Sequence, residues 1–340
     1  MSETMFGVSV IVPVFIKFEL ETGRRLLKRA LESAINQDYP GPMEILVVDD
    51  GSPVPVEGFS CESGFSDFPI RWIRIPENRG LVAALNLALT HASYPLIARL
   101  DADDRWLKNK MSLQLRQFAS DPDLTLSATG MSRVDDRGNP IDTHIRPETW
   151  QGILQYAATK GCPFPHGSIV ARKDVFRLLG NYDWAASAAH CEDYALWVLW
   201  IRFFKTTMIA QSLYEYTVSP NSVSGLHADQ QRIATSLVRQ SILQSGIGAS
   251  LPGALQALSE ILHASMFEAG SLSYLMWKSD LMAVRLSQPA ANALQRVLPD
   301  RYVMAVPEEG LEWQQVVNGN IGCERRSPVG THSTVRAIKA

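Results

Sequence analysis

Apolar runs of strand length alternate with helical segments over the first hundred residues, and this alternation constrains the fold more than any other feature of the chain. Runs of β-branched and other apolar residues predict strands over 8–15, 44–48, 70–75 and 95–100. Apolar residues at helical spacing predict helices over 24–36 and 80–91. Because this order is typical of parallel sheets, we expect an α/β domain with a mixed, mainly parallel sheet flanked by helices.

The pattern continues beyond residue 104 with less regular spacing. We expect a helix over 106–118, an extended segment over 124–134, a hairpin-like turn over 133–140, a helix over 191–204 and a short strand over 212–218. Asp104 is expected to cap the helix that begins near Trp106, because Asp is a preferred N-cap residue. The aromatic side chains of the helix over 191–204 lie at helical spacing, which favours a place in the core. They are Tyr194, Trp197, Trp200, Phe203 and Phe204.

Three regions of the chain differ in composition. Residues 1–226 contain the alternation of strands and helices, and 227–322 carry leucines at helical spacing, which predicts a helical C-terminal segment. Residues 323–340 are polar and mildly basic, so a flexible tail is expected there. The sequence shows neither a signal peptide nor a run of about 20 apolar residues. We therefore expect a cytoplasmic protein whose membrane contact, if it has one, is peripheral.

Charge and cysteine content exclude two classes of site. The chain has 32 Lys and Arg against 35 Asp and Glu, a net charge of −3, whereas a nucleic-acid binder needs clustered positive charge. Its four cysteines are Cys61, Cys162, Cys191 and Cys323. They lie far apart and form no C-x-x-C pair, so neither a zinc site nor a disulfide framework is indicated.

Acidic turns follow two of the predicted strands. Asp49 and Asp50 end the second strand, and Asp101 and Asp103 follow the fourth. Ligands of open α/β sheets bind outside the carboxyl ends of the strands, so we expect the site there. Carboxylates two residues apart suit Mg²⁺ or Mn²⁺, which take oxygen ligands and share them with phosphate oxygens and water. Taken alone, residues 49–52 are more typical of a turn with a helix cap, and their position alongside Asp101 is what favours a site.

An ordered set of motifs over residues 8–225 resembles the family 2 glycosyltransferases, which have the fold called GT-A. The motifs are Ile-Val-Pro-Val at 11–14, Gln-Asp-Tyr-Pro at 37–40, Val-Val-Asp-Asp-Gly-Ser at 47–52, Asn-Arg-Gly at 78–80, Leu-Asp-Ala-Asp-Asp at 100–104, Pro-His-Gly-Ser at 165–168 and Glu-Asp-Tyr-Ala-Leu-Trp at 192–197. Each motif is weak alone, and their shared order is specific. The resemblance implies an inverting enzyme that moves a sugar from a nucleoside diphosphate to an acceptor hydroxyl.

The resemblance also implies a donor site at the acidic turns. The residues expected to bind the nucleotide sugar are Pro13, Val14, Phe15, Asp49, Asp50, Asn78, Arg79, Asp101, Ala102 and His166. Asp103, with Asp101, is expected to bind Mn²⁺ or Mg²⁺, because a cation neutralises the diphosphate leaving group. For Arg79 a solvated loop charge, and for His166 a merely hydrogen-bonded ring, are equally open.

A further acidic pair opens the helix over 191–204. By resemblance, Asp193 takes the proton from the acceptor hydroxyl, and Glu192 is its neighbour or substitute. A single displacement with one base inverts the anomeric centre. The alternative is that both carboxylates only interact favourably with the helix dipole. Trp184, shortly before the pair, is predicted to stack on the acceptor.

The implied partners are a nucleoside-diphosphate sugar, with a UDP-sugar as the first choice, and a glycan or lipid-linked acceptor for a surface polymer. The main alternative is a non-catalytic nucleotide-sugar binding or regulatory protein of the same fold, which retention of both Asp103 and Asp193 disfavours. A Rossmann dehydrogenase needs a glycine-rich loop after the first strand, and residues 8–22 contain no glycine. Phe15 and Ala195 depart from the family's usual Tyr and Asp, so substrate preference stays open, as does oligomeric state.

Overall fold

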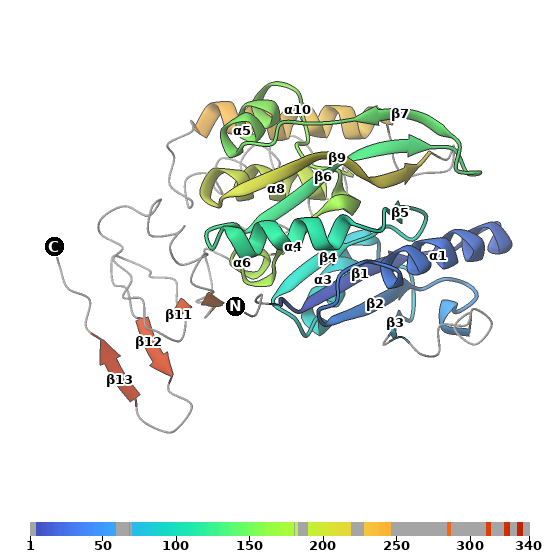
Figure 1. Ribbon diagram of the computed structural model, residues 1–340, viewed down its shortest axis with the longest axis horizontal. Helices are drawn as coiled ribbons and strands as arrows, with labels where there is room; N and C mark the ends of the chain where they lie inside the picture. The colour runs from blue at the N-terminus through green and yellow to red at the C-terminus, as the bar shows by residue number, and fades with distance from the viewer. Residues whose placement is uncertain are drawn as a thin grey trace.

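The computed structural model describes residues 5–58, 68, 70–179, 181–182, 190–218 and 228–245, together with four short strands nearer the C-terminus. One nine-stranded sheet organises the chain in the order β3-β2-β1-β4-β8-β6-β9-β5, with β7 paired to β6 (Figure 1). Trp184 lies outside the described residues, so its predicted role stays a prediction.

Parallel pairing forms the longer ladders of this sheet. The first half is parallel and consists of β1 (Val8–Val14), β2 (Met43–Asp50), β3 (Ile70–Ile75) and β4 (Leu96–Arg99). In the second half, β8 (Val170–Arg172) is antiparallel to β4 and to β6 (Leu126–Val134), and β9 (Thr206–Thr217) is parallel to β6. The antiparallel strands β5 (Arg105–Trp106) and β7 (Pro140–His144) pair with β9 and β6. The mixed, mainly parallel sheet is confirmed.

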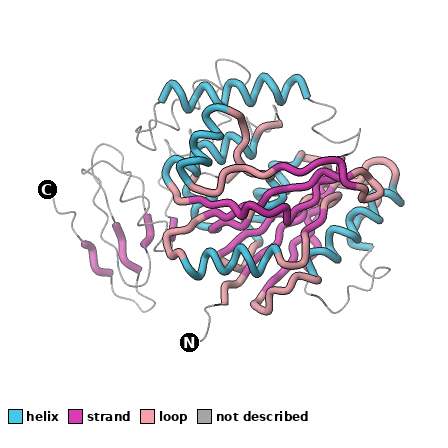
Figure 2. The backbone as a smooth tube through the Cα atoms, turned by 45° about the horizontal axis from the view of Figure 1, so that its top comes forward, coloured by secondary structure: helices cyan, strands magenta, loops and turns pink. Residues whose placement is uncertain are grey.

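Helices cover both faces of the sheet, and Figure 2 shows the strands as a layer between them. One face carries α1 (Leu20–Ile35) and α4 (Lys110–Ser120). The other carries α3 (Leu81–His91), α5 (Trp150–Thr159), α6 (Lys173–Leu178), α8 (Glu192–Phe203) and α10 (Ala228–Ser245). Successive strand residues point to opposite faces, so Ile45 and Val47 of β2 join one core while Leu46 and Val48 join the other. Two single 3₁₀ turns, η1 (Val56–Gly58) and η2 (His166–Ser168), lie in the loops.

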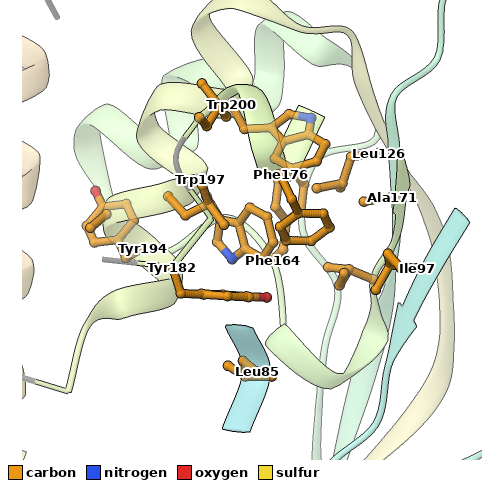
Figure 3. Close-up of a cluster of buried hydrophobic side chains, with 14 of the residues drawn as sticks. Leu85, Ile97, Leu126, Phe164, Ala171, Phe176, Tyr182, Tyr194, Trp197 and Trp200 are labelled. Carbon is orange, nitrogen blue, oxygen red and sulfur yellow. The ribbon is translucent and has the colours of Figure 1, made fainter. Parts of the chain in front are cut away.

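The aromatic residues of α8 are core residues, as predicted. Tyr194, Trp197, Trp200 and Phe204 are each at most 1% exposed. Trp197 and Trp200 meet edge to face with ring centroids 5.8 Å apart, an arrangement that favours aromatic pairs (Figure 3). The side chain of Phe203 lies outside the described residues.

The helix predicted over 106–118 is wrong at its start. Residues Arg105 and Trp106 instead form β5, because they pair with Glu215 and Tyr214 of β9. Helix α4 begins at Lys110, so Asp104 is not its N-cap. Strand β9 is also longer than predicted, since it begins at Thr206 and not at 212.

The described parts of the C-terminal region are one helix and two strand pairs. Helix α10 packs against α5 and α8, and its Ala234 and Val238 are buried in the same core as α8. The antiparallel pairs are β10 (Val284–Leu286) with β11 (Leu311–Trp313) and β12 (Cys323–Arg326) with β13 (His332–Val335). The sequence does not predict these strands. Among the described residues, no helix is both long and apolar enough to cross a membrane.

Candidate active site

The turn after β2 is built around the carboxylate of Asp49. Its two oxygens accept hydrogen bonds from the backbone N–H of Ser52 at 2.8 Å and of Val56 at 3.3 Å. Arg74 of β3 pairs with the same carboxylate and donates to the Ser52 carbonyl at 2.8 Å. The side chain of Asp49 is 4% exposed. The protein itself therefore uses most of the hydrogen-bonding capacity of Asp49, as the turn alternative predicts.

Asp50 holds the loop that leads into α3. Its carboxylate accepts hydrogen bonds from Asn78 Nδ2 at 2.9 Å, from the Arg79 backbone N–H at 2.8 Å and from the Gly80 backbone N–H at 2.7 Å. Burial raises the pKa of Asp50, and the two backbone donors oppose that rise. The Arg79 side chain is 65% exposed and lies 3.8 Å from Glu77. Asn78 and the Arg79 backbone thus have a structural task at Asp50.

A glycine allows this loop to pack closely on the β2 turn. Gly51 has φ +73°, a conformation that favours glycine. A Cβ atom at this position would lie 2.4 Å from the Asn78 backbone nitrogen. Any side chain here would therefore displace the loop that Asp50 holds.

Strand β1 ends beside the β2 turn, because the two strands are parallel and Val14 lies opposite Asp49. Pro13 and Val14 are buried, whereas Phe15 is 42% exposed. The backbone N–H of Ile16 donates to Ser52 Oγ at 3.0 Å and ties the two segments together. Of the three residues predicted here, only Phe15 has an exposed side chain.

The turn after β4 begins with a buried ion pair that the sequence analysis missed. Arg99, the last residue of β4, is 3% exposed, and its two terminal nitrogens donate to the two carboxylate oxygens of Asp101 at 2.6 and 2.5 Å. Tyr214 Oη of β9 donates to Asp101 at 3.3 Å. Burial acts to lower the pKa of Arg99, but the charge of Asp101 outweighs it and the pKa is raised. The guanidinium therefore stays charged inside the protein.

The next two carboxylates of this turn differ in their partners. Asp104 is buried and accepts hydrogen bonds from the Thr217 backbone N–H at 2.7 Å and from the Tyr214 hydroxyl. Within the described residues, the Asp103 carboxylate has no hydrogen-bond or ion-pair partner from another residue, although its carbonyl oxygen accepts from Arg29 at 2.8 Å. Burial and the charge of Asp101 raise the pKa of Asp103 to about 6. Asp103 is thus the carboxylate of this turn that the protein leaves open.

The acidic pair at the start of α8 consists of two carboxyl groups whose pKa values are both raised. Glu192 is 8% exposed, and burial together with the charge of Asp193 raises its pKa to about 8. Asp193 accepts hydrogen bonds from the Tyr194 backbone N–H at 2.7 Å and from Cys162 Sγ at 3.6 Å. Burial raises the pKa of Asp193, while these donors and the charge of Arg99 oppose the rise. Burial thus raises the pKa of both carboxyl groups, and only that of Asp193 is opposed by hydrogen bonds from another residue's backbone and a thiol.

His166 is a half-buried ring in η2 that contacts Tyr182 and Trp197. Its Nε2 lies 2.7 Å from the Tyr182 hydroxyl, and its ring meets Trp197 edge to face at 5.7 Å. Burial, followed by the charge of Arg99, lowers the pKa of His166 well below its usual value. Asn86 of α3 clamps the Tyr182 backbone through hydrogen bonds of 3.1 Å to its N–H and its carbonyl oxygen. The structure thus shows His166 as a hydrogen-bonded ring, one of the two alternatives that the sequence left open. Its contact with the sugar donor stays a prediction.

The charge of Arg99 acts on most of the candidate site. It alters the pKa of Asp103 after β4, of His166 in η2, and of Glu192 and Asp193 in α8. One cation therefore acts on residues of three motifs, the most distant of which is Asp193, 94 positions after Arg99 in the sequence. A signal was present in the sequence: an arginine interrupts the apolar run Leu96–Leu100 directly before the acidic turn.

Known glycosyltransferases are similar to this chain in sequence. A glycosyltransferase of Haemophilus influenzae is 27% identical over 207 residues, 61% of this chain and 70% of its own. The amylovoran biosynthesis glycosyltransferase AmsE of Erwinia amylovora is 28% identical over 56% of this chain and 68% of its own. Both belong to the same class of enzyme by name.

Two solved structures share the fold. A mannosyltransferase of Pyrobaculum calidifontis, in complex with GDP-Man and Mn²⁺, superposes with a TM-score of 0.54 at 18% identity, over 81% of this chain and 79% of that one. S. aureus TarS 1–349, in complex with UDP-GlcNAc, gives 0.51 at 17% identity, over 75% and 71%. The fold is therefore GT-A. Residues 9–180 match the family described as Glycosyl transferase family 2, half of the chain, and with the acidic turns of β2 and β4 inside that match this chain belongs to family 2 of the glycosyltransferases.

Proposed function

We propose that this chain is an inverting glycosyltransferase that moves a sugar from a nucleoside diphosphate to the hydroxyl of a glycan or lipid-linked acceptor in surface polysaccharide synthesis. The observation that carries the proposal is the shared influence of Arg99 on an open carboxylate, Asp103, and on an acidic pair, Glu192 and Asp193. The amylovoran relative supports the polysaccharide assignment. A cytoplasmic location with peripheral membrane contact stays a prediction of the sequence.

The donor is proposed to be a UDP-sugar, with a GDP-sugar as the outcome to test against it. The TarS complex holds UDP-GlcNAc and the mannosyltransferase complex holds GDP-Man, so the fold accepts both bases. Phe15 has the exposed aromatic face at the end of β1. We propose that it contacts the base, while Pro13, Val14, Asp49, Asp50, Asn78 and Arg79 shape the surrounding backbone.

The residues present fit a divalent cation at Asp103. Its carboxylate has no partner from another described residue, and burial raises its pKa to about 6, so a cation would offset an unfavourable buried charge. Within the described ranges, no three His, Cys, Asp or Glu side chains form a complete metal site. This suits a metal such as Mn²⁺ or Mg²⁺ that takes most of its ligands from water and diphosphate oxygens. When bound, the cation neutralises the leaving diphosphate.

Asp101 fits the metal less well than Asp103. Both of its oxygens accept hydrogen bonds from Arg99, so ligation would require that pair to loosen. Its side chain is nevertheless 25% exposed. We propose that Asp101 and Ala102 contact the ribose or the sugar, and that Asp103 is the principal metal ligand.

Asp193 is proposed as the general base. It is charged when Glu192 holds the proton, and its raised pKa brings it closer to neutral pH, where a general base is most effective. The Tyr194 N–H and the Cys162 thiol hold its two oxygens in place. Attack by the deprotonated hydroxyl on the anomeric carbon displaces the diphosphate in one step and inverts that carbon.

A panel of nucleotide sugars with Mn²⁺ or Mg²⁺ tests this function, with released UDP or GDP as the readout. Asp193→Asn should lower kcat about 100-fold or more and leave donor KM nearly unchanged, the scale of general-base catalysis. Hydrolysis of no nucleotide sugar by the intact protein would favour the non-catalytic alternative.

Asp174→Asn is the matched control. Asp174 lies in the first turn of α6 and accepts the backbone N–H of the next residue at 3.0 Å, as Asp193 does at 2.7 Å. A purely dipolar role for Asp193 predicts the same small effect in both variants. A wild-type rate in folded Asp193→Asn would therefore refute the assignment of the base.

A further inference from the structure

Arg99 is the more deeply buried of the two arginines that form ion pairs at the acidic turns. The side chain is 3% exposed, and two parallel hydrogen bonds of 2.6 and 2.5 Å join it to Asp101. The backbone N–H of Arg99 donates to the Ile169 carbonyl at 3.3 Å. This bond joins the backbone of Arg99 to the segment that follows His166. The orientation of the side chain is therefore fixed from both ends.

Stability alone is a poor explanation for this pair. Desolvation of two buried charges consumes most of their attraction, and a well-packed apolar pair is often as stable. The Nε–H of Arg99 is buried and has no hydrogen-bond partner among the described residues, which adds to the cost. A feature that is unfavourable for folding and lies between proposed donor and acceptor groups points to a role in the reaction.

The groups around Arg99 come from both sides of the proposed reaction. Asp101 lies at the donor turn, whereas Glu192 and Asp193 open α8, and Tyr182 and Tyr214 complete the surroundings. Among the described titratable groups, those that interact with Asp193 are Glu192 on its own helix, Arg99 at the end of β4, Cys162 before η2, Arg146 before α5 and Tyr182 after α6. Arg99 has the larger influence of the two cations.

We propose that Arg99 is a positioning residue of the transfer reaction: its guanidinium fixes Asp101 at the donor turn and supplies the positive charge that faces Glu192 and Asp193. The inference rests on the proposed function. It adds that one buried cation links the geometry of the donor turn to the charge of the base. Two properties of arginine have separate roles in this proposal. The planar guanidinium holds both oxygens of Asp101, and the positive charge favours the charged form of Asp193.

The directions in which two substitutions shift the pH profile of kcat test this link between Arg99 and the base. Arg99→Gln removes the cation, so the acid limb of the kcat profile should move to higher pH by about one pH unit, and kcat on the acid side of the limb should fall about tenfold. Asp101→Asn removes the anion that neutralises Arg99, so the limb should move to lower pH. Hydrolysis of the donor found by the nucleotide-sugar panel, at saturating donor, is the measurement. A merely structural pair would shift neither limb, or both in the same direction.

Two further variants separate charge from geometry and guard against misfolding. Arg99→Lys keeps the charge and loses the fork, so the limb should stay within about 0.3 pH unit of wild type while the Kd for UDP with Mn²⁺ rises several-fold. The double variant Arg99→Gln/Asp101→Asn leaves no unpaired buried charge, and its limb should lie between those of the single variants. If Arg99→Gln does not fold, two measurements still test the proposal. The acid limb should move to lower pH in Asp101→Asn, and it should move back toward higher pH in the double variant.

Arg133→Gln is the matched control, because Arg133 forms a similar two-pronged pair with Asp142 at the surface, 39% and 36% exposed. Its pH profile should equal that of wild type. A limb at the wild-type position in folded Arg99→Gln and in Asp101→Asn overturns the proposal while the glycosyltransferase function stands. Full activity in Asp193→Asn would instead overturn the base, a distinct outcome.

Discussion

The turns after β2 and β4 look alike in sequence and differ in what the protein does with their carboxylates. At the β2 turn, Asp49 and Asp50 together accept hydrogen bonds from donors in β3, in the turn and in the loop before α3. At the β4 turn, Asp101 is paired with Arg99 and Asp103 has no partner from another described residue. The two acidic turns at the carboxyl ends of the strands therefore differ: the carboxylates of the first hold the surrounding backbone, and the second keeps a carboxylate without such a partner.

The largest effect that tests this contrast is on metal-dependent nucleotide binding. Asp103→Asn should weaken the affinity for UDP or GDP in Mn²⁺ by on the order of 100-fold, because it removes the open carboxylate that suits the cation. Asp49→Asn should change it only a few-fold, since the protein already occupies that side chain. Calorimetric titration with and without Mn²⁺ provides the comparison. Equal losses in the two variants would remove the distinction between the turns.

The reverse contrast is expected in stability. Asp50→Ala leaves the Asn78 amide and the Arg79 and Gly80 backbone N–H groups without their acceptor, at a cost of about 2 kcal/mol in the free energy of unfolding. Asp103→Ala should cost nothing or be stabilising, because it removes a partly buried charge that has no partner among the described residues. Urea unfolding of both variants measures the difference. A larger loss for Asp103→Ala would show that the β4 turn is the structural one.

Protons should compete with Mn²⁺ for the Asp103 carboxylate, so metal-dependent nucleotide affinity should depend on pH. The pKa of Asp103 is about 6, so at pH 5 roughly one molecule in ten keeps this carboxylate charged, and Mn²⁺-dependent nucleotide affinity should fall about tenfold from its value at pH 7. For stability the sign is opposite: a pKa raised above its unfolded value means that stability is lost as pH rises from about 4 to 6. In Asp103→Asn both dependences should disappear. A tenfold pH effect that persists in this variant must come from another group.

The smallest expected effect concerns Arg74, which pairs with Asp49 at the β2 turn. Arg74 is 35% exposed, so Arg74→Gln should lower the free energy of unfolding by about 1 kcal/mol or less and leave the KM for donor within two-fold. Thermal unfolding and donor hydrolysis check the two statements. A rise in KM with unchanged stability would place Arg74 in contact with the donor.

The sequence predicts the fold and the positions of the acidic residues well, because period and turn chemistry are local signals. The strands over 43–50 and 96–99 and the acidic residues at their carboxyl ends appear where the apolar runs place them. The partners of each carboxylate do not follow from local signals: the donors to Asp50 lie 28 to 30 residues away, and those to Asp104 lie 110 to 113 residues away. The error over β5 has the same origin, since pairing with β9 overrides the local helical pattern.

Burial of charge is the other property that the sequence conceals. Lys110 is fully buried, and its Nζ has no hydrogen-bond partner in the part of the chain that the structure describes; it lies over the Trp106 ring, 4.0 Å from the centroid. Arg99 is equally hidden, although both residues would be placed on the surface by residue type alone. Only the packing of neighbouring elements distinguishes such residues from ordinary surface charges.

The attachment of the β4 turn to β9 has a consequence for synthesis of the chain. The Thr217 N–H and hydroxyl bind the Asp104 carboxylate at 2.7 Å and the Asp103 carbonyl at 2.6 Å, and the Tyr214 hydroxyl binds Asp104 as well. A ribosome makes the acidic turn more than a hundred residues before these groups exist, so the nascent turn lacks three of its hydrogen-bond donors until β9 emerges. The segment that matches the family ends at residue 180, before any of them. Maturation of the donor turn is thus a late event in translation, timed by a strand from outside the segment that identifies the family.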